Sequence, residues 1–152
     1  VCEYLYNSAI EIVTKVGFAD RFMGVAQQAR FVGHGIGLEI NEAPVLAPRI
    51  RREFEEGMVT TDEPGIYIEG SHGIRTENEL LCRKGEQNGY GQFMHFEDLT
   101  YVPIDLDGID PAAMEENEKK TLNAYHKSVY EKLSPYFEGE ELEFLKKATR
   151  EI

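Results

Sequence analysis

Three short segments carry side chains that could bind a hydrolytic metal ion. His34 lies in the segment GHGIG, Glu63 in DEPG and Glu77 in GIRTEN. A neutral imidazole and carboxylate oxygens form a ligand set suited to Mn, Zn, Co or Fe. Two carboxylates can bridge a pair of metal ions, and such a pair lowers the pKa of a bound water until it serves as a nucleophile near neutral pH. The sequence therefore offers ligands for a metal-dependent hydrolase.

Each of these signals has a simpler interpretation when it is taken alone. A histidine among glycines is more often structural than metal-ligating. Glu63 is by default a solvated turn residue or a helix-cap partner. The glycines around His34 also suggest a phosphate loop, but the third glycine of the Gly-x-Gly-x-x-Gly dinucleotide pattern, a following helix and a Lys-Ser/Thr pair are all missing. Spacing alone does not decide between these interpretations.

The elements that must position these residues are mainly strands. Alternation of apolar and polar residues with a period of two is typical of a strand with one buried face. A run of glycines and polar residues is typical of a loop, and Pro64–Gly65 of a turn. On these grounds strands are expected over 36–40, 58–61, 66–68, 74–82 and 93–102, with a loop over 84–92.

Helices are expected at both ends of the chain. Apolar residues at spacings of three and four predict a first helix that ends at Gly17, a suitable C-cap. Asp110 and Pro111 suit the N-cap and first position of a second helix, which Pro135 ends. A third helix follows over 142–148. The buried stripe of the first helix would hold Cys2, Leu5, Ala9, Ile12 and Val16, and that of the second Leu122, Tyr125, Val129 and Leu133.

Composition limits the class of protein. The chain has 152 residues, 41% of them hydrophobic, and a formal net charge of -12. This charge gives little attraction for nucleic acid or anionic lipid, and no apolar run approaches the roughly 18 residues of a membrane span. Two cysteines form no disulfide framework, which favours a reducing, cytoplasmic compartment. A first residue other than Met, already inside a helix, fits a fragment of a longer chain.

Four motifs together resemble one family. GHGIG, DEPGIYI, GIRTEN and FEDLTYVPID occur in the order found in the metallopeptidases of the pita-bread fold, which include aminopeptidase P, prolidase and methionine aminopeptidase, together with the related creatinase. The short gap between Glu63 and Glu77 and the helical tail are similar to the long-form aminopeptidase P (Xaa-Pro aminopeptidase) branch. The resemblance implies an α/β (α+β) fold: the C-terminal half of a pita-bread domain with a mainly antiparallel sheet over 1–102, then a two-helix C-terminal segment over 103–152.

The resemblance also implies a role for each site residue. His34 matches a metal-binding histidine, and Glu63 a metal-ligating glutamate that is also the general base or proton shuttle. Glu77 matches the carboxylate that bridges two metal ions. Arg75 matches an arginine near the substrate, although it could equally neutralise Glu77 or Glu79.

The implied activity is removal of the N-terminal residue of a peptide that has proline at the second position. The implied cofactor is a pair of divalent metal ions, with Mn favoured and Zn or Co as alternatives. Neither nucleic acid nor a membrane is expected as a partner. A homodimer through the C-terminal region is expected from the resemblance.

Two departures from the family affect these expectations. The family's site also needs two aspartates from an earlier hairpin, and Asp20 is the only aspartate before His34, so the isolated chain is expected to be inactive. Arg30 and Asn41 stand where related aminopeptidases carry histidines, and Asn41 could hydrogen-bond a substrate without shuttling a proton. The alternative function is a non-catalytic pita-bread module that binds peptides or proteins. Metal-independent hydrolysis of the creatinase type is a third.

Overall fold

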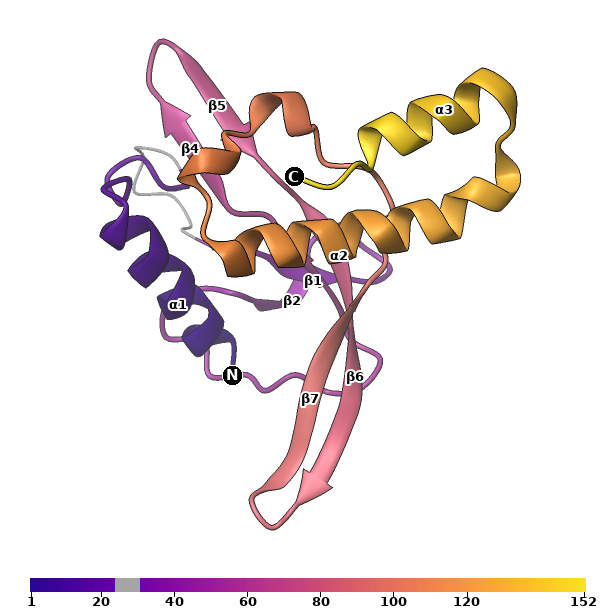
Figure 1. Cartoon of the computed structure of the whole chain (residues 1–152). Helices are drawn as coiled ribbons and strands as arrows, with labels where there is room; N and C mark the ends of the chain where they lie inside the picture. Colours follow the sequence, from indigo (N-terminus) through magenta and orange to yellow (C-terminus); the bar gives the residue numbers. More distant parts are fainter. Residues whose placement is uncertain (24–30) are drawn as a thin grey trace. The chain divides into compact units, whose positions relative to one another are not determined.

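The chain folds into two compact units (Figure 1). The computed structural model describes residues 1–23 and 31–152. Within this described part, the first unit, Val1–Thr100, contains one α-helix and the strands, and the second unit, Tyr101–Ile152, is helical. The predicted α/β class with a mainly antiparallel sheet is therefore confirmed. The interpretation of 1–102 as a partial catalytic domain and of 103–152 as its tail stays a prediction.

A five-stranded sheet of order β2-β1-β3-β6-β7 forms the centre of the first unit. All its neighbouring strands are antiparallel, and β4 and β5 pair separately in a two-stranded antiparallel sheet. The strands are β1 (His34–Ile36), β2 (Glu42–Val45), β3 (Val59–Asp62), β4 (Gly65–Ile68), β5 (His72–Arg75), β6 (Asn78–Asn88) and β7 (Gly91–Asp98).

The two sheets meet at a short break that contains two of the predicted ligands. The β3–β6 ladder ends with the pair Asp62 and Asn78, and the β4–β5 ladder begins with the pair Gly65 and Arg75. Glu63 and Glu77 lie in the break, one on each side. Continuing either register places Glu63 and Glu77 at facing positions.

Helix α1 (Cys2–Lys15) packs on the first unit through a different face from the one predicted. Tyr6 joins a buried core cluster, and Ala9, Ile10 and Val13 pack against this cluster. The predicted stripe was correct for Cys2 and Ala9 but wrong for the other three members, because helix α1 carries more than one apolar stripe and only one meets the core. Leu5 is 38%, Ile12 63% and Val16 61% exposed.

The strand predicted over 36–40 is wrong. β1 ends at Ile36, and residues 37–41 form bends in which Leu38 and Ile40 are exposed. The reason is that β2 must turn back to pair with β1, since Gly35 is the partner of Glu42. The alternating apolar residues therefore fall in the connection between the strands.

The loop predicted over 84–92 is also wrong. β6 continues to Asn88, pairs through Asn88 with Gly91 and returns as β7 after a two-residue turn. Gly91 has a φ of 131°, which favours glycine at the end of this turn. Because backbone hydrogen bonds form the ladder, the polar side chains and glycines of this segment do not prevent strand formation.

The second unit is built on α2 (Glu116–Leu133) and α3 (Gly139–Ala148). Asp110 caps only a short 3-10 turn over Pro111–Ala113, so the predicted start of the long helix was too early. The helix begins instead after a capping box, in which Glu115 and Glu118 each bond the other's backbone N–H. Leu122 and Val129 of α2 are buried, as predicted, and Leu145 of α3 is buried as well. None of the described helices combines the length and the apolar character that a membrane-spanning helix requires.

Candidate metal centre

His34 and Glu63 lie beside each other because of the register of two neighbouring strands. His34 begins β1, and Glu63 directly follows β3. Gly35 pairs with Thr60 in this antiparallel ladder, so His34 comes opposite Thr61. The sheet thus brings together an imidazole and a carboxylate that are 29 positions apart in the sequence.

The His34 imidazole directs its Nε2 at the Glu63 carboxylate. His34 Nδ1 lies 3.0 Å from the carbonyl oxygen of Gly35, which only accepts hydrogen bonds, so Nδ1 carries the proton. His34 Nε2 lies 3.1 Å from Glu63 Oε1, and the two side chains are only 11% and 6% exposed. In the neutral tautomer two acceptors therefore face each other, and a cation or a proton between them satisfies both.

The Thr61 hydroxyl holds both ligands in place. It accepts a hydrogen bond from the backbone N–H of His34 at 2.9 Å and donates one to Glu63 Oε1 at 3.0 Å. Thr61 is buried, and a Cβ at Gly33 would collide with its carbonyl oxygen. Sequence reasoning missed Thr61. The available signal was its position two residues before Glu63, where β-strand geometry puts both side chains on one face.

Arg75 contacts the other oxygen of Glu63. Its Nη1 donates to Glu63 Oε2 at 2.7 Å, and its Nε donates to the Tyr67 hydroxyl at 2.8 Å. The hydrogen bond to Tyr67 and, to a smaller extent, the charges of Glu63 and Glu77 raise the pKa of Arg75. Arg75 is therefore a fixed cation, and Tyr67, a second residue that sequence reasoning missed, orients it.

The remaining predicted residues lie outside this close cluster. Glu77 is on the far side of Arg75, with its Oε2 at 3.9 Å from Arg75 Nη1 and a half-exposed side chain. The neutralising role considered for Arg75 thus applies to Glu63 as well as to Glu77. Asn41 is exposed in the bend before β2, at the opposite end of the β1–β2 ladder from His34. Arg30 lies outside the described residues.

The His34–Glu63 pair fits one divalent metal ion. A metal-ligating histidine characteristically donates its other ring N–H to a carbonyl or carboxylate, and His34 Nδ1 does so to Gly35. The Glu63 oxygen beside it is the type of donor that Mn and Zn accept. Within residues 1–23 and 31–152, however, no three His, Cys, Asp or Glu side chains are grouped so that they could hold one ion. The described residues alone therefore form no complete cluster of metal ligands.

Both halves of the chain match models of a single peptidase family. Residues 1–84 match metallopeptidase family M24, and residues 92–152 match the C-terminal region of peptidase M24. The first match alone spans more than half of the chain. The chain belongs to metallopeptidase family M24. The resemblance inferred from the four sequence motifs is thereby confirmed.

Curated relatives of this M24 chain carry the same enzyme name. A probable Xaa-Pro aminopeptidase P of Pyrenophora tritici-repentis (strain Pt-1C-BFP) is 38% identical over 128 residues, which cover 77% of this chain and 22% of the relative. Another, of Ajellomyces dermatitidis (strain ER-3 / ATCC MYA-2586), is 37% identical over 131 residues, covering 79% and 21%. The M24 chain thus spans about a fifth of the length of these relatives.

A solved structure shows the same fold. The X-prolyl aminopeptidase of Caenorhabditis elegans, described as a cytosolic enzyme with a di-nuclear active site, matches with a TM-score of 0.68 and 32% identity. The match covers 80% of this M24 chain and 21% of that structure. The chain has the fold of a segment of a pita-bread aminopeptidase.

Proposed function

We propose that the chain is part of a metal-dependent Xaa-Pro aminopeptidase, in which His34 and Glu63 bind a catalytic metal. The observation that carries the proposal is the buried pair of His34 Nε2 and Glu63 Oε1, 3.1 Å apart, in a chain similar to Xaa-Pro aminopeptidases. An acceptor pair of this kind, with Nδ1 held by a carbonyl, suits a bound cation better than a solvated turn.

The reaction would be hydrolysis of the bond between the first residue of a peptide and a proline. Two divalent ions, when bound, supply a water of lowered pKa and charge stabilisation for the tetrahedral oxyanion. Glu63 receives the water's proton at its carboxylate and passes it to the leaving amine. Thr61 and Arg75 fix the orientation of that carboxylate, since each donates a hydrogen bond to one of its oxygens.

Glu77 and Asn41 are assigned the remaining roles. Glu77, which faces Glu63 across the break between the ladders, would help to hold the two ions. Arg75 holds the peptide carbonyl on its exposed side, since its side chain is 44% exposed. Asn41 is exposed in the bend before β2, and its proposed hydrogen bond to the substrate rests on the family resemblance alone. Manganese is the preferred ion for a carboxylate-rich site, with zinc and cobalt as alternatives.

The isolated chain is proposed to be inactive. Its described residues supply too few grouped ligands for one ion, whereas a tight dinuclear site needs a full set. Two aspartates from the rest of the complete protein would complete it. The complete enzyme would work in the cytoplasm on peptides and dimerise through its C-terminal region.

The test is hydrolysis of a peptide with proline at the second position in the presence of Mn²⁺. The longer polypeptide that contains this sequence should cleave it, and Glu63→Gln should abolish turnover. The 152-residue chain alone should not cleave it. Turnover by the isolated chain would refute the missing-ligand account, and no turnover by the longer protein would favour the alternative of a non-catalytic binding module.

A further inference from the structure

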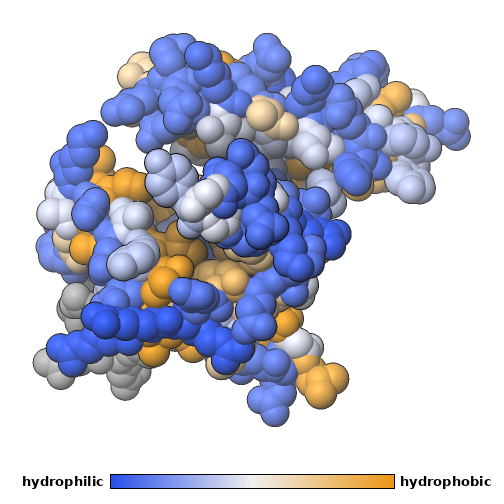
Figure 2. Space-filling view, turned by 90° about the horizontal axis from the view of Figure 1, so that it is seen from below, coloured by the Kyte–Doolittle hydropathy of each residue, from blue (hydrophilic) through white to orange (hydrophobic). Residues whose placement is uncertain are grey.

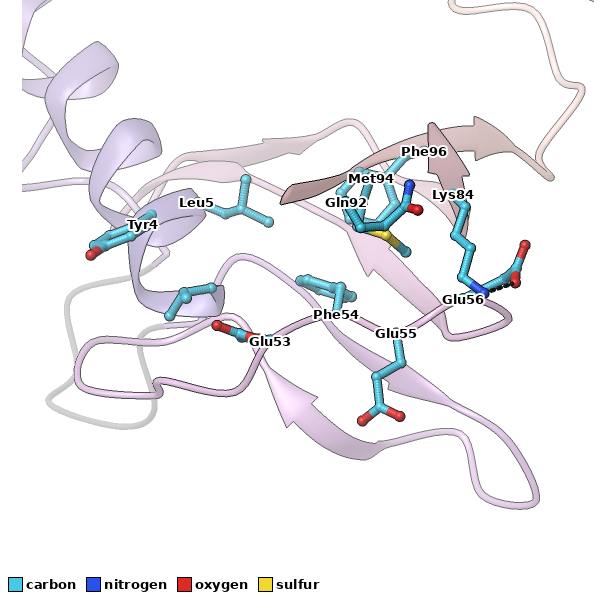
Figure 3. Close-up of a pocket in the computed structure, with 11 residues that line it drawn as sticks. Tyr4, Leu5, Glu53, Phe54, Glu55, Glu56, Lys84, Gln92, Met94 and Phe96 are labelled. Atoms are coloured by element: carbon cyan, nitrogen blue, oxygen red, sulfur yellow. Dashed lines mark ion pairs between the residues drawn. The ribbon is translucent and has the colours of Figure 1, made fainter. Parts of the chain in front are cut away.

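The β6–β7 hairpin is held at its base by ion pairs and is exposed at its tip. Figure 3 shows the ion pair at the base between Lys84 Nζ and Glu56 Oε2, which lie 3.1 Å apart. Arg83 Nε also donates to Glu97 Oε2 at 2.9 Å. All residues over 85–93 are exposed. Figure 2 looks from the direction in which the hairpin of Figure 1 points, and most side chains on that face are hydrophilic. Water therefore reaches the turn that joins the two strands.

The carboxamide of Asn88 is folded back onto the main chain at this turn. Asn88 is the only asparagine in the sequence that is followed by glycine. Its Oδ1 accepts a hydrogen bond from the backbone N–H of Tyr90 at 3.0 Å, which brings its Cγ toward the nitrogen of Gly89. The same hydrogen bond withdraws electron density from the side-chain carbonyl. Cγ of Asn88 is therefore both close to a nucleophile and activated as an electrophile.

The backbone N–H of Gly89 is the nucleophile, and no hydrogen bond within the described part of the chain occupies it. Because Gly89 has no side chain, nothing shields its nitrogen from the carboxamide. Asn117 of α2 is a useful contrast, since it is also exposed. The residue that follows it, Glu118, donates its N–H to the carbonyl oxygen of Glu115 at 3.0 Å. Exposure alone therefore does not distinguish Asn88, whereas the unoccupied N–H beside it does.

We propose that Asn88–Gly89 is a self-modification site at which Asn88 is converted to isoaspartate. The Gly89 nitrogen attacks Cγ of Asn88, an N–Cγ bond forms, the Cγ–Nδ2 bond breaks, and the Gly89 amide proton leaves with Nδ2 as ammonia. Water then opens the resulting five-membered succinimide ring. Attack at Cγ gives aspartate, and attack at the backbone carbonyl carbon gives isoaspartate, in which the main chain runs through Cβ and Cγ. The net reaction consumes one water, releases one ammonia and involves no oxidation.

The modification opens the end of the β6–β7 ladder. Asn88 pairs there with Gly91, and an additional main-chain atom moves this pair out of register. The new carboxylate also replaces an Nδ2 that donates to Glu86 Oε1 at 3.3 Å, so two negative charges face each other. Asn88 and Asn78 are the two ends of β6, roughly 33 Å apart at about 3.3 Å per residue. The candidate metal centre, which lies beyond Asn78, therefore keeps its geometry.

Peptide mapping of the longer polypeptide after prolonged incubation at neutral pH tests the site. The tryptic fragment 85–119 contains both Asn88 and Asn117, and conversion of an amide to an acid adds about 1 Da. The gain should arise at Asn88 at least about tenfold faster than at Asn117. Gly89→Ala should slow it about tenfold without strain, because a Cβ at Gly89 meets no atom within 4 Å and its φ lies outside the left-handed region. Equal rates at the two asparagines, or an unchanged rate in Gly89→Ala, overturn the proposal.

An isoaspartate methyltransferase with labelled S-adenosylmethionine distinguishes the two products, because it methylates isoaspartate and not aspartate. The incubated protein should take up label at position 88, and Asn88→Gln should not. Amide hydrogen exchange in the modified protein should be at least about tenfold faster at Gly91 and unchanged at Glu97. Absence of label at position 88, or unchanged exchange at Gly91, overturns the proposal. None of these measurements involves metal binding or peptidase activity, so their failure is distinct from a failure of the proposed function.

Discussion

The imidazole Nε2 of His34 faces the carboxylate Oε1 of Glu63 at 3.1 Å, inside the first unit, with the protonated Nδ1 turned to a backbone carbonyl. The arrangement leaves two acceptors opposed unless a cation or a proton lies between them. The Thr61 hydroxyl fixes one side of the Glu63 carboxylate and Arg75 the other. The pair is therefore held in one geometry before any ligand binds, which reduces the cost of ordering it around a metal ion.

Thr61→Val should weaken both the fold and the metal site. The substitution keeps the side chain's shape but removes the hydroxyl, which leaves the His34 N–H without its acceptor and Glu63 Oε1 without its donor. We expect the free energy of unfolding to fall by about 1–3 kcal/mol, and Mn²⁺ affinity in the longer polypeptide to fall about 10–100-fold. Urea unfolding and calorimetric titration measure the two effects. Thr61→Ser retains the hydroxyl and is the control. Unchanged metal affinity in Thr61→Val would contradict the positioning role.

Arg75→Gln should be more harmful than Tyr67→Phe. Arg75 neutralises a nearly buried carboxylate at 2.7 Å, whereas Tyr67 supplies one hydrogen bond to the guanidinium. Tyr67→Phe should lower the free energy of unfolding by about 1 kcal/mol or less, and Arg75→Gln should lower it further. Urea unfolding of both variants in parallel gives the comparison. If the two variants lose the same free energy of unfolding, Arg75 stabilises the fold mainly through Tyr67 rather than through Glu63.

The second unit should lose stability on acidification. His126 is fully buried in α2, and its Nε2 accepts a hydrogen bond from the backbone N–H of Ile104 at 3.0 Å. Burial lowers the pKa of His126. Because the folded pKa lies below the unfolded value of about 6.5, its contribution to stability is complete above about pH 6.5 and is lost as the pH falls through the folded pKa.

An NMR titration of the His126 ring measures the folded pKa, and unfolding at several pH values measures the loss. His126→Gln keeps an acceptor for Ile104 but does not titrate, so it should remove this component of the acid sensitivity. If His126→Gln and the parent chain lose equal stability between neutral pH and pH 5, a group other than His126 causes the acid sensitivity.

The candidate ligand residues could be selected from the sequence, but the residues that hold them in place could not. The order of the motifs indicated His34, Glu63 and Glu77, and the family resemblance implied that Arg75 lies near the substrate. The Thr61 hydroxyl contacts both His34 and Glu63 because the pairing of β1 with β3 places Thr61 opposite His34. Gly35 and Thr60 are 25 positions apart in the sequence, and neither segment alone determines the register in which their strands pair.

The errors in the predicted elements have the same origin. The spacing of apolar residues correctly predicted a helix over Cys2–Lys15, but it did not show which of two apolar stripes packs on the core. Glycines in 84–92 suggested a loop, although the backbone ladder continues to Asn88. Local pattern predicts the type of an element better than its partners, because partners depend on residues far away in the sequence.

The most direct test of the central claim is the metal content of the longer polypeptide, with and without His34. The parent protein, dialysed against Mn²⁺ and then against metal-free buffer, should retain two ions per chain, as expected for a dinuclear site. His34→Ala should retain fewer than two ions per chain. Asn41→Ala changes a proposed substrate contact and should retain both ions. Full metal content in the folded His34→Ala protein would contradict the claim that the His34–Glu63 pair is a metal ligand pair.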